Sequence, residues 1–134
     1  EIQEQIIDEF SFFEDWMDKY EYIIDLGKSL PLIEEKYKDE DHLIKGCQSQ
    51  VWLNAELNGS QIKFTADSDA VITKGIIALL VRVLSNQSAE DVAAADLYFI
   101  NQIGLKEHLS MTRSNGLVSM VKQMKIYGLA LQAN

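Results

Sequence analysis

The sequence is poor in cysteine and proline, with Cys47 and Pro31 the single examples among 134 residues. One cysteine excludes an internal disulfide, and it excludes the multi-cysteine sites that hold structural zinc or an iron–sulfur cluster within one chain. Long apolar runs are also missing, since the longest covers residues 76–81. That run is far shorter than the roughly 20 residues that a membrane-spanning helix needs.

Basic residues are scarce as well. Twelve Lys and Arg against 21 Asp and Glu leave a formal net charge of −9. This balance argues against nucleic acid and against an anionic membrane surface, because both are bound through clusters of Lys and Arg. No signal-peptide pattern opens the sequence, so we expect a reducing, cytoplasmic location. The length and the lack of repeats or linkers predict a single domain over residues 1–134.

Residues 51–66 carry the clearest local pattern, with two alternating segments on either side of Asn58-Gly59. Apolar residues fill the odd positions of the first segment and the even positions of the second, and Asn-Gly is a strong hairpin signal. A two-residue loop at these positions would pair Leu53 with Phe64. The pattern therefore predicts an antiparallel hairpin with one buried face.

Apolar residues recur at helical spacing on both sides of the hairpin. After it, we expect a helix capped by Ser68 or Asp69 and a second helix that begins at Ser88 and continues to about residue 100. Gly75 costs the first of these about 1 kcal/mol relative to Ala, which a close helix contact would offset. Residues 117–131 form a last amphipathic helix.

This order of elements predicts the fold class. Helices, then a meander of strands, then helices are typical of an α+β fold. We expect a small antiparallel sheet, made of the hairpin 51–66 and at least one more strand, covered by helices on one face.

Cys47 is the side chain best suited to nucleophilic chemistry, and its neighbours are small or polar: Gly46, Gln48, Ser49 and Gln50. A lone cysteine is often a small buried hydrophobe. Here, Gly46 allows an unusual backbone conformation, and Lys45 brings a positive charge that favours the thiolate. If the extended phase of the strand continues backwards, Cys47 points to the buried side of the sheet. The prediction is a partly sheltered thiol at the end of the sheet.

At these residues the sequence resembles the SufE family of sulfur acceptor proteins. Four blocks match in order: Tyr22-Ile23-Ile24-Asp25-Leu26-Gly27 with Leu30-Pro31; Gly46-Cys47-Gln48-Ser49-Gln50-Val51-Trp52-Leu53; Ala66-Asp67-Ser68-Asp69-Ala70 with Ile72 and Lys74-Gly75; and His108-Leu109-Ser110 with Arg113, Asn115-Gly116-Leu117 and Met120. Together they cover nearly the whole chain. A glycine–cysteine pair alone would be weak evidence, whereas a collinear set of blocks is specific.

The resemblance implies a mechanism and partners. The family takes sulfur from a cysteine desulfurase, and the pyridoxal phosphate of that reaction belongs to the desulfurase, so no bound cofactor or metal is expected in this chain. Cys47 is then the nucleophile that carries the persulfide. The resemblance also implies a SufS-like or CsdA-like desulfurase, delivery to a SufBCD-type scaffold, and a fold like that of the IscU-type scaffolds. The sequence does not distinguish the two desulfurases, and a homodimer stays open.

Other residues of the matching blocks are candidates for supporting roles or partner contact: Gly46, Gln48, Ser49, Gln50, Trp52, Asp67, Asp69, His108 and Arg113. His108 is either a structural histidine or a base for Cys47. Arg113 either braces a loop or stabilises a thiolate. Asp67 and Asp69 are too few ligands for a divalent metal and fit a strand end better.

Other functions remain open at the level of the sequence. An iron–sulfur cluster scaffold would need more thiolates than one chain offers, unless a dimer shares the cluster. A hydrolase built on Cys47 and His108 would turn over a substrate without a protein partner. A purely structural interaction domain would tolerate the loss of the Cys47 thiol.

Overall fold

The structure is a computed structural model that describes residues 2–132. It combines a three-stranded antiparallel sheet, in the order β1-β2-β3, with helices. The elements in chain order are α1 (Ile2–Ser11), α2 (Trp16–Gly27), the 3-10 turns η1 (Glu35–Tyr37) and η2 (Glu40–His42), β1 (Val51–Asn58), β2 (Gln61–Ser68), α3 (Val71–Leu84), β3 (Gln87–Ser88), α4 (Ala89–Ala94), α5 (Phe99–Gln102), α6 (Leu105–His108) and α7 (Met111–Gln132).

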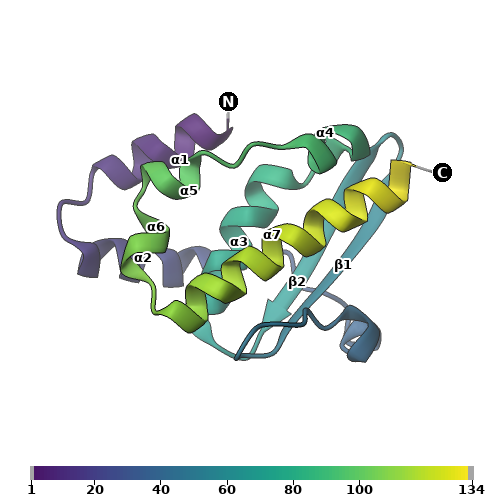
Figure 1. Cartoon of the computed structure of the whole chain (residues 1–134), viewed down its shortest axis with the longest axis horizontal. Helices are drawn as coiled ribbons and strands as arrows, with labels where there is room; N and C mark the ends of the chain where they lie inside the picture. The colour runs from purple at the N-terminus through teal and green to yellow at the C-terminus, as the bar shows by residue number, and fades with distance from the viewer. Residues whose placement is uncertain (1, 133–134) are drawn as a thin grey trace.

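The helix α3 occupies the centre of the molecule. Eleven of its 14 residues are buried, so it has neighbours on every side, as a helix that is apolar all round requires. It packs against α2, β2 and α7. Figure 1 shows the long α7 crossing in front of α3, with the hairpin on one side of α3 and α1, α2, α5 and α6 gathered on the other.

The predicted α+β class and the small antiparallel sheet are confirmed. The short strand β3 supplies the expected third strand by pairing with β2 at residues 61 and 62. Between residues 2 and 132, no helix has both the length and the apolar character needed to cross a bilayer.

The hairpin forms where predicted, but its register differs by two residues. Leu53 pairs with Ala66 and not with Phe64. The loop begins at Gly59, which has a positive φ of 66°, while Asn58 stays in β1 with a negative φ. A loop centred on Asn58-Gly59 needs positive φ at both residues, whereas glycine alone satisfies the first central position of a type II′ turn. A shift of two residues keeps the side chains on their predicted faces.

The predicted helix starts have different outcomes. Ser88 caps α4, because its Oγ accepts a hydrogen bond from a first-turn N–H at 3.1 Å. The predicted cap of α3 is wrong, since its N-cap is Ala70, which makes no side-chain cap hydrogen bond. Ser68 and Asp69 instead hydrogen-bond to Gln50 in the loop before β1.

The helix expected from Ser88 to residue 100 is also shorter than predicted. The first helix, α4, ends at Ala94, and Ala95 has extended backbone with φ −61° and ψ 135°. Helix α5 then begins at Phe99. Apolar residues continue through the break because the extended segment is covered by α1: the Gln3 side chain donates to the Asp96 carbonyl at 3.0 Å.

Candidate functional site

Cys47 lies in the loop that joins η2 to β1. The Ile44 N–H donates to the Val51 carbonyl at 2.8 Å, which closes residues 45–50 into a loop at the end of the sheet. The Cys47 side chain is half-buried and packs against the hydrophobic core. It therefore lies on the buried side, as predicted, although bends at residues 48–49 break the extended phase on which that prediction rested.

Gly46 allows the loop to lie tightly against α7. Its φ is +90°, a value that residues with a Cβ rarely adopt. A Cβ at this position would lie 2.5 Å from the Ser119 Oγ. The backbone conformation therefore favours glycine next to Cys47, and a larger residue there would also force the Ser119 hydroxyl to move.

The Cys47 thiol borders a small cavity of about 20 Å³. Its walls come from the Cys47 loop, α3 and α7: Cys47, Gln48, Ser49, Thr73, Ile76, Thr112, Arg113, Gly116 and Met120. The Sγ lies 3.7 Å from the Gly116 carbonyl, to which it donates. One water-sized probe needs roughly 10–15 Å³, so the space beside the thiol fits about one additional atom.

Burial raises the pKa of the Cys47 thiol above its ordinary value. The cause is that apolar surroundings penalise the thiolate more than the neutral thiol. The expectation that Lys45 favours the thiolate is therefore wrong for this structure, in which Lys45 is exposed. The resting Cys47 is a protected thiol that needs a change of surroundings before it reacts quickly.

Gln50 ties the Cys47 loop to the start of α3. Its N–H donates to Asp69 Oδ1 at 3.0 Å, and its carbonyl accepts from the Ser68 hydroxyl at 2.8 Å and the Asp69 N–H at 3.2 Å. Asp69 thus positions the loop from outside the cavity. The structure brings Asp69 and Gln50 together, a pairing that the sequence did not predict.

Asp67 belongs to a charged cluster on the other face of the sheet. Its carboxylate lies 2.7 Å from Lys38 Nζ and 3.3 Å from Lys74 Nζ. Burial alone would raise its pKa, but hydrogen bonds from Lys38, Ser68 and Lys74 outweigh burial and hold the pKa below its usual range. Lys38 also lies 5.4 Å from the centre of the Trp52 ring. Within residues 2–132 no three His, Cys, Asp or Glu side chains are grouped to hold a metal.

His108 and Arg113 have different positions relative to Cys47. His108, at the end of α6, stacks on Trp16 with ring centroids 4.4 Å apart, and it is not part of the cavity wall. Arg113 is part of that wall, and its Nη1 donates to the Tyr20 hydroxyl at 3.4 Å. The structure therefore brings Arg113, but not His108, to the thiol.

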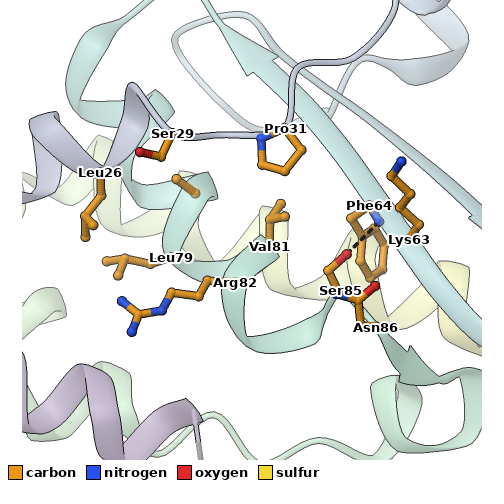
Figure 2. A pocket seen from close by; sticks show the side chains of 11 residues that line it. Leu26, Ser29, Pro31, Lys63, Phe64, Leu79, Val81, Arg82, Ser85 and Asn86 are labelled. Atoms are coloured by element: carbon orange, nitrogen blue, oxygen red, sulfur yellow. Dashed lines mark hydrogen bonds between the residues drawn. The ribbon is translucent and has the colours of Figure 1, made fainter.

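A larger cavity of about 370 Å³ lies away from Cys47, among α2, α3 and β2. Figure 2 shows apolar side chains such as Leu26, Leu79 and Val81 around it, with Ser85 and Asn86 at the end where Ser85 Oγ accepts from the Phe64 N–H. It shares no lining residue with the Cys47 cavity. This larger cavity is not the candidate functional site, because the nucleophile Cys47 borders the smaller one.

Sequence reasoning missed the walls that α3 and α7 contribute. Thr73, Ile76 and Thr112 come close to Cys47 only through the tertiary fold. Thr73 gave a weak signal in the sequence, since it is a polar residue in an otherwise apolar helix. In the structure its exposure is only 6%. Ile76 looks like any other core residue in the sequence.

Comparisons with known proteins agree on one family. A family model described as "SufE: Fe-S metabolism associated domain" matches residues 4–127. An uncharacterized SufE-like protein of Rhizobium etli is 43% identical over 127 residues, which cover 91% of this chain and 86% of that protein. An uncharacterized SufE-like protein of Rhizobium meliloti is 39% identical over 127 residues, covering 91% of each.

A solved structure supports the fold. The solution structure of a hypothetical protein from Thermus thermophilus superimposes with a TM-score of 0.82, covering 99% of this chain and 97% of that chain. At 17% identity, this likeness shows the fold alone. The matching family model and the two relatives confirm the resemblance that the four sequence blocks indicated: the chain belongs to the SufE family, whose domain is associated with Fe–S metabolism.

Proposed function

We propose that this protein accepts sulfur on Cys47 from a pyridoxal-phosphate-dependent cysteine desulfurase, stimulates that enzyme and delivers the sulfur to a SufBCD-type iron–sulfur scaffold. The observation that carries the proposal is a half-buried thiol beside a cavity of about 20 Å³. Membership in the SufE family supports it. The protein acts as an accessory of the desulfurase, without a complete active site or a cofactor of its own.

The proposed step is a thiol exchange at a persulfide. The Cys47 thiol first loses its proton to solvent or to a base of the partner, and the thiolate attacks the outer sulfur of the desulfurase persulfide. A new S–S bond forms at Cys47, and the desulfurase cysteine departs with the electron pair of the broken S–S bond as a thiolate. The outer sulfur keeps its oxidation state, so no external oxidant or reductant is needed.

The resting site favours protection over reactivity. Because burial raises the pKa of Cys47, little thiolate is present at neutral pH. Docking of the desulfurase therefore has to move the loop 45–50 or bring positive charge to the thiol. On this chain, Arg113 is the cation in the cavity wall, and a guanidinium there would stabilise the thiolate that forms.

Intact-mass spectrometry under non-reducing conditions tests the acceptor role. The protein is mixed with a cysteine desulfurase and L-cysteine, alongside a Cys47→Ser variant as the control. We expect the wild type to gain one or more sulfur masses that a reductant removes, and the variant to gain none. Absence of added sulfur with several desulfurases would contradict the proposal.

The cavity also predicts how easily small thiols reach the persulfide. A second sulfur that occupies the cavity is shielded, so glutathione should remove it more slowly from the folded protein than from a peptide of residues 45–50. Gly116→Ala places a Cβ 3.5 Å from the Cys47 Sγ, an ordinary contact that fills part of the space without a clash. We expect this variant to fold and its persulfide to be stripped faster. Equal rates for protein and peptide would rule out the sheltered state.

A further inference from the structure

The outward face of α7 carries apolar side chains that the described part of the chain leaves about half exposed or more. Met111, Val118, Ile126 and Leu129 are 82%, 49%, 43% and 61% exposed. At about 100° per residue, these positions lie within roughly 80° of one another around the helix axis. They therefore form one stripe along the helix, which Figure 1 shows crossing the front of the molecule.

The charge of α7 differs from that of the rest of the chain. The helix holds three cations, Arg113, Lys122 and Lys125, and no acid. Lys122 lies on the same face as the exposed apolar residues, and neither lysine forms an ion pair within the part of the chain that the structure describes. By contrast, residues 1–42 hold 14 of the 21 acids and four of the 12 Lys and Arg. In a chain of net charge −9, this face carries two lysines, and Glu90 of α4 borders it at Leu129.

These properties indicate what kind of protein surface can bind to the stripe. An apolar stripe flanked by lysines is complementary to a surface that has apolar groups at its centre and acids at its rim. Two copies of this chain paired through α7 across a two-fold axis would place Lys122 and Lys125 of both copies in one interface. Like charges would then oppose that pairing. The favoured occupant is an acidic surface of a different protein.

The stripe and the Cys47 cavity lie on the same helix but on different sides of it. Thr112, Arg113, Gly116 and Met120 line the cavity, roughly 100–200° around the helix axis from Met111. Ser119, next to the stripe, lies against Gly46 of the Cys47 loop, and the stripe runs from there to Leu129. Over the 13 residues from Gly116 to Leu129 the helix extends about 20 Å. A protein seated on the stripe therefore lies beside the Cys47 loop at one end and also holds contacts far from it.

We propose that the α7 stripe, with Lys122 at its centre, is the docking surface for the acidic partner that receives sulfur from Cys47. This proposal rests on the proposed function. Two proteins must reach Cys47 in turn, and the cavity mouth is common to both of them. Loading by the desulfurase involves the loop 45–50, which is held by Asp69 before α3 and by the Gly116 carbonyl of α7. Neither residue belongs to the stripe, so the receiver's contacts on the stripe do not overlap with these hydrogen bonds.

Separate loading and unloading assays test this surface. The double variant Lys122→Glu with Leu129→Ser changes one charge and one exposed apolar side chain, far from the thiol. The matched control is Lys106→Glu with Phe12→Ser, at exposed positions outside α7. Cys47 is loaded with a desulfurase and L-cysteine, the persulfidated protein is purified, and loss of the extra sulfur mass to a SufBCD-type scaffold complex is followed at low salt.

We expect the α7 variant to be loaded within about twofold of wild type and to be unloaded at least about tenfold more slowly, while the control variant behaves as wild type. Circular dichroism verifies that both variants fold. Unchanged unloading would overturn the proposal. Equal slowing of loading would assign the stripe to the desulfurase, and a changed oligomeric state by light scattering would assign it to a second copy. Failure of wild-type loading would count against the proposed function instead.

Discussion

At the scale of single residues, Gly46 and Gly59 illustrate two different reasons for a glycine: backbone conformation alone, and backbone conformation together with a close side chain. Both have positive φ, +90° and +66°. A Cβ at Gly59 meets nothing within 4 Å, whereas one at Gly46 lies 2.5 Å from the Ser119 Oγ. We expect Gly59→Ala to lower the free energy of unfolding by about 1–2 kcal/mol, from backbone strain alone, and Gly46→Ala to lower it further.

Urea denaturation of the two variants measures this difference. Adding Ser119→Ala to Gly46→Ala removes the Oγ, so the double variant should recover the steric part and approach the loss seen for Gly59→Ala. Equal losses for the two single variants would show that the Ser119 hydroxyl moves aside at no measurable cost.

The raised pKa of the Cys47 thiol predicts that the free energy of unfolding falls at alkaline pH. Because burial raises its pKa above the ordinary 9.0, the folded protein keeps a proton that the unfolded chain has already lost at the same alkaline pH. The stabilising contribution is complete below the unfolded pKa and is lost as pH rises through the folded one. Denaturation at a series of alkaline pH values should show this decline. Cys47→Ser should remove only the part due to the thiol, because burial also raises the pKa values of Tyr22 and Tyr127, which contribute a loss of the same sign.

Alkylation gives a second readout of the same shift. Iodoacetamide reacts with the thiolate, so folded Cys47 should react more slowly near pH 7 than the same residue in urea. Faster reaction in the folded state would mean that the thiolate is stabilised in the resting site.

At the scale of elements, sequence periodicity predicted the hairpin, the helices around it and the buried side for Cys47. It failed where geometry depends on distant contacts. The register moved because Asn58 stays in β1 and Gly59 alone turns the chain. Ser68 and Asp69 do not cap α3, because their side chains hydrogen-bond to the backbone of Gln50. Gln50 lies 18 and 19 residues earlier in the chain, so local sequence does not reveal these bonds. The α3 and α7 walls of the Cys47 cavity follow from packing and not from local pattern.

The contact between α2 and α3 explains a glycine that helix propensity disfavours. A Cβ on Gly75 would clash with the Ile23 carbonyl oxygen, and a Cβ on Gly27 would lie 3.0 Å from the Gly75 nitrogen. The two backbones touch, as the sequence analysis required for offsetting the cost of Gly75. In an exposed helix, Gly→Ala would gain about 1 kcal/mol. Here Gly75→Ala should instead lose about 1–3 kcal/mol, because α2 and α3 must move apart.

Thermal and urea unfolding of Gly75→Ala check the sign of this effect. A matched control is Ser114→Ala in α7, a helical position outside the α2–α3 contact. A stabilised Gly75→Ala variant would mean that the helices separate at little cost and that the close approach is not needed.

At the scale of the whole molecule, charge is divided between the two ends of the sequence. Residues 1–42 contribute 14 acids and four Lys or Arg, while α7 contributes three cations and no acid. An asymmetric charge steers encounters with oppositely charged surfaces and affects association rates more than final affinity. The acidic part suits a desulfurase with a basic docking surface, and the α7 stripe suits an acidic receiver.

This division predicts how salt acts on the desulfurase. Stimulation at subsaturating protein should weaken as salt rises from about 0.05 M to about 0.5 M, because the Debye length falls from more than about 10 Å to less than about 8 Å. Stimulation at saturating protein should change much less, since steering alters association rather than the sulfur transfer itself. The double variant Glu21→Gln with Glu40→Gln, at exposed positions of the acidic part, should flatten the salt dependence, whereas Glu90→Gln with Glu107→Gln should leave its slope nearly as in the wild type. A salt-independent wild type would show that short-range contacts around Cys47 bring the two proteins together and that the acidic end has no steering role.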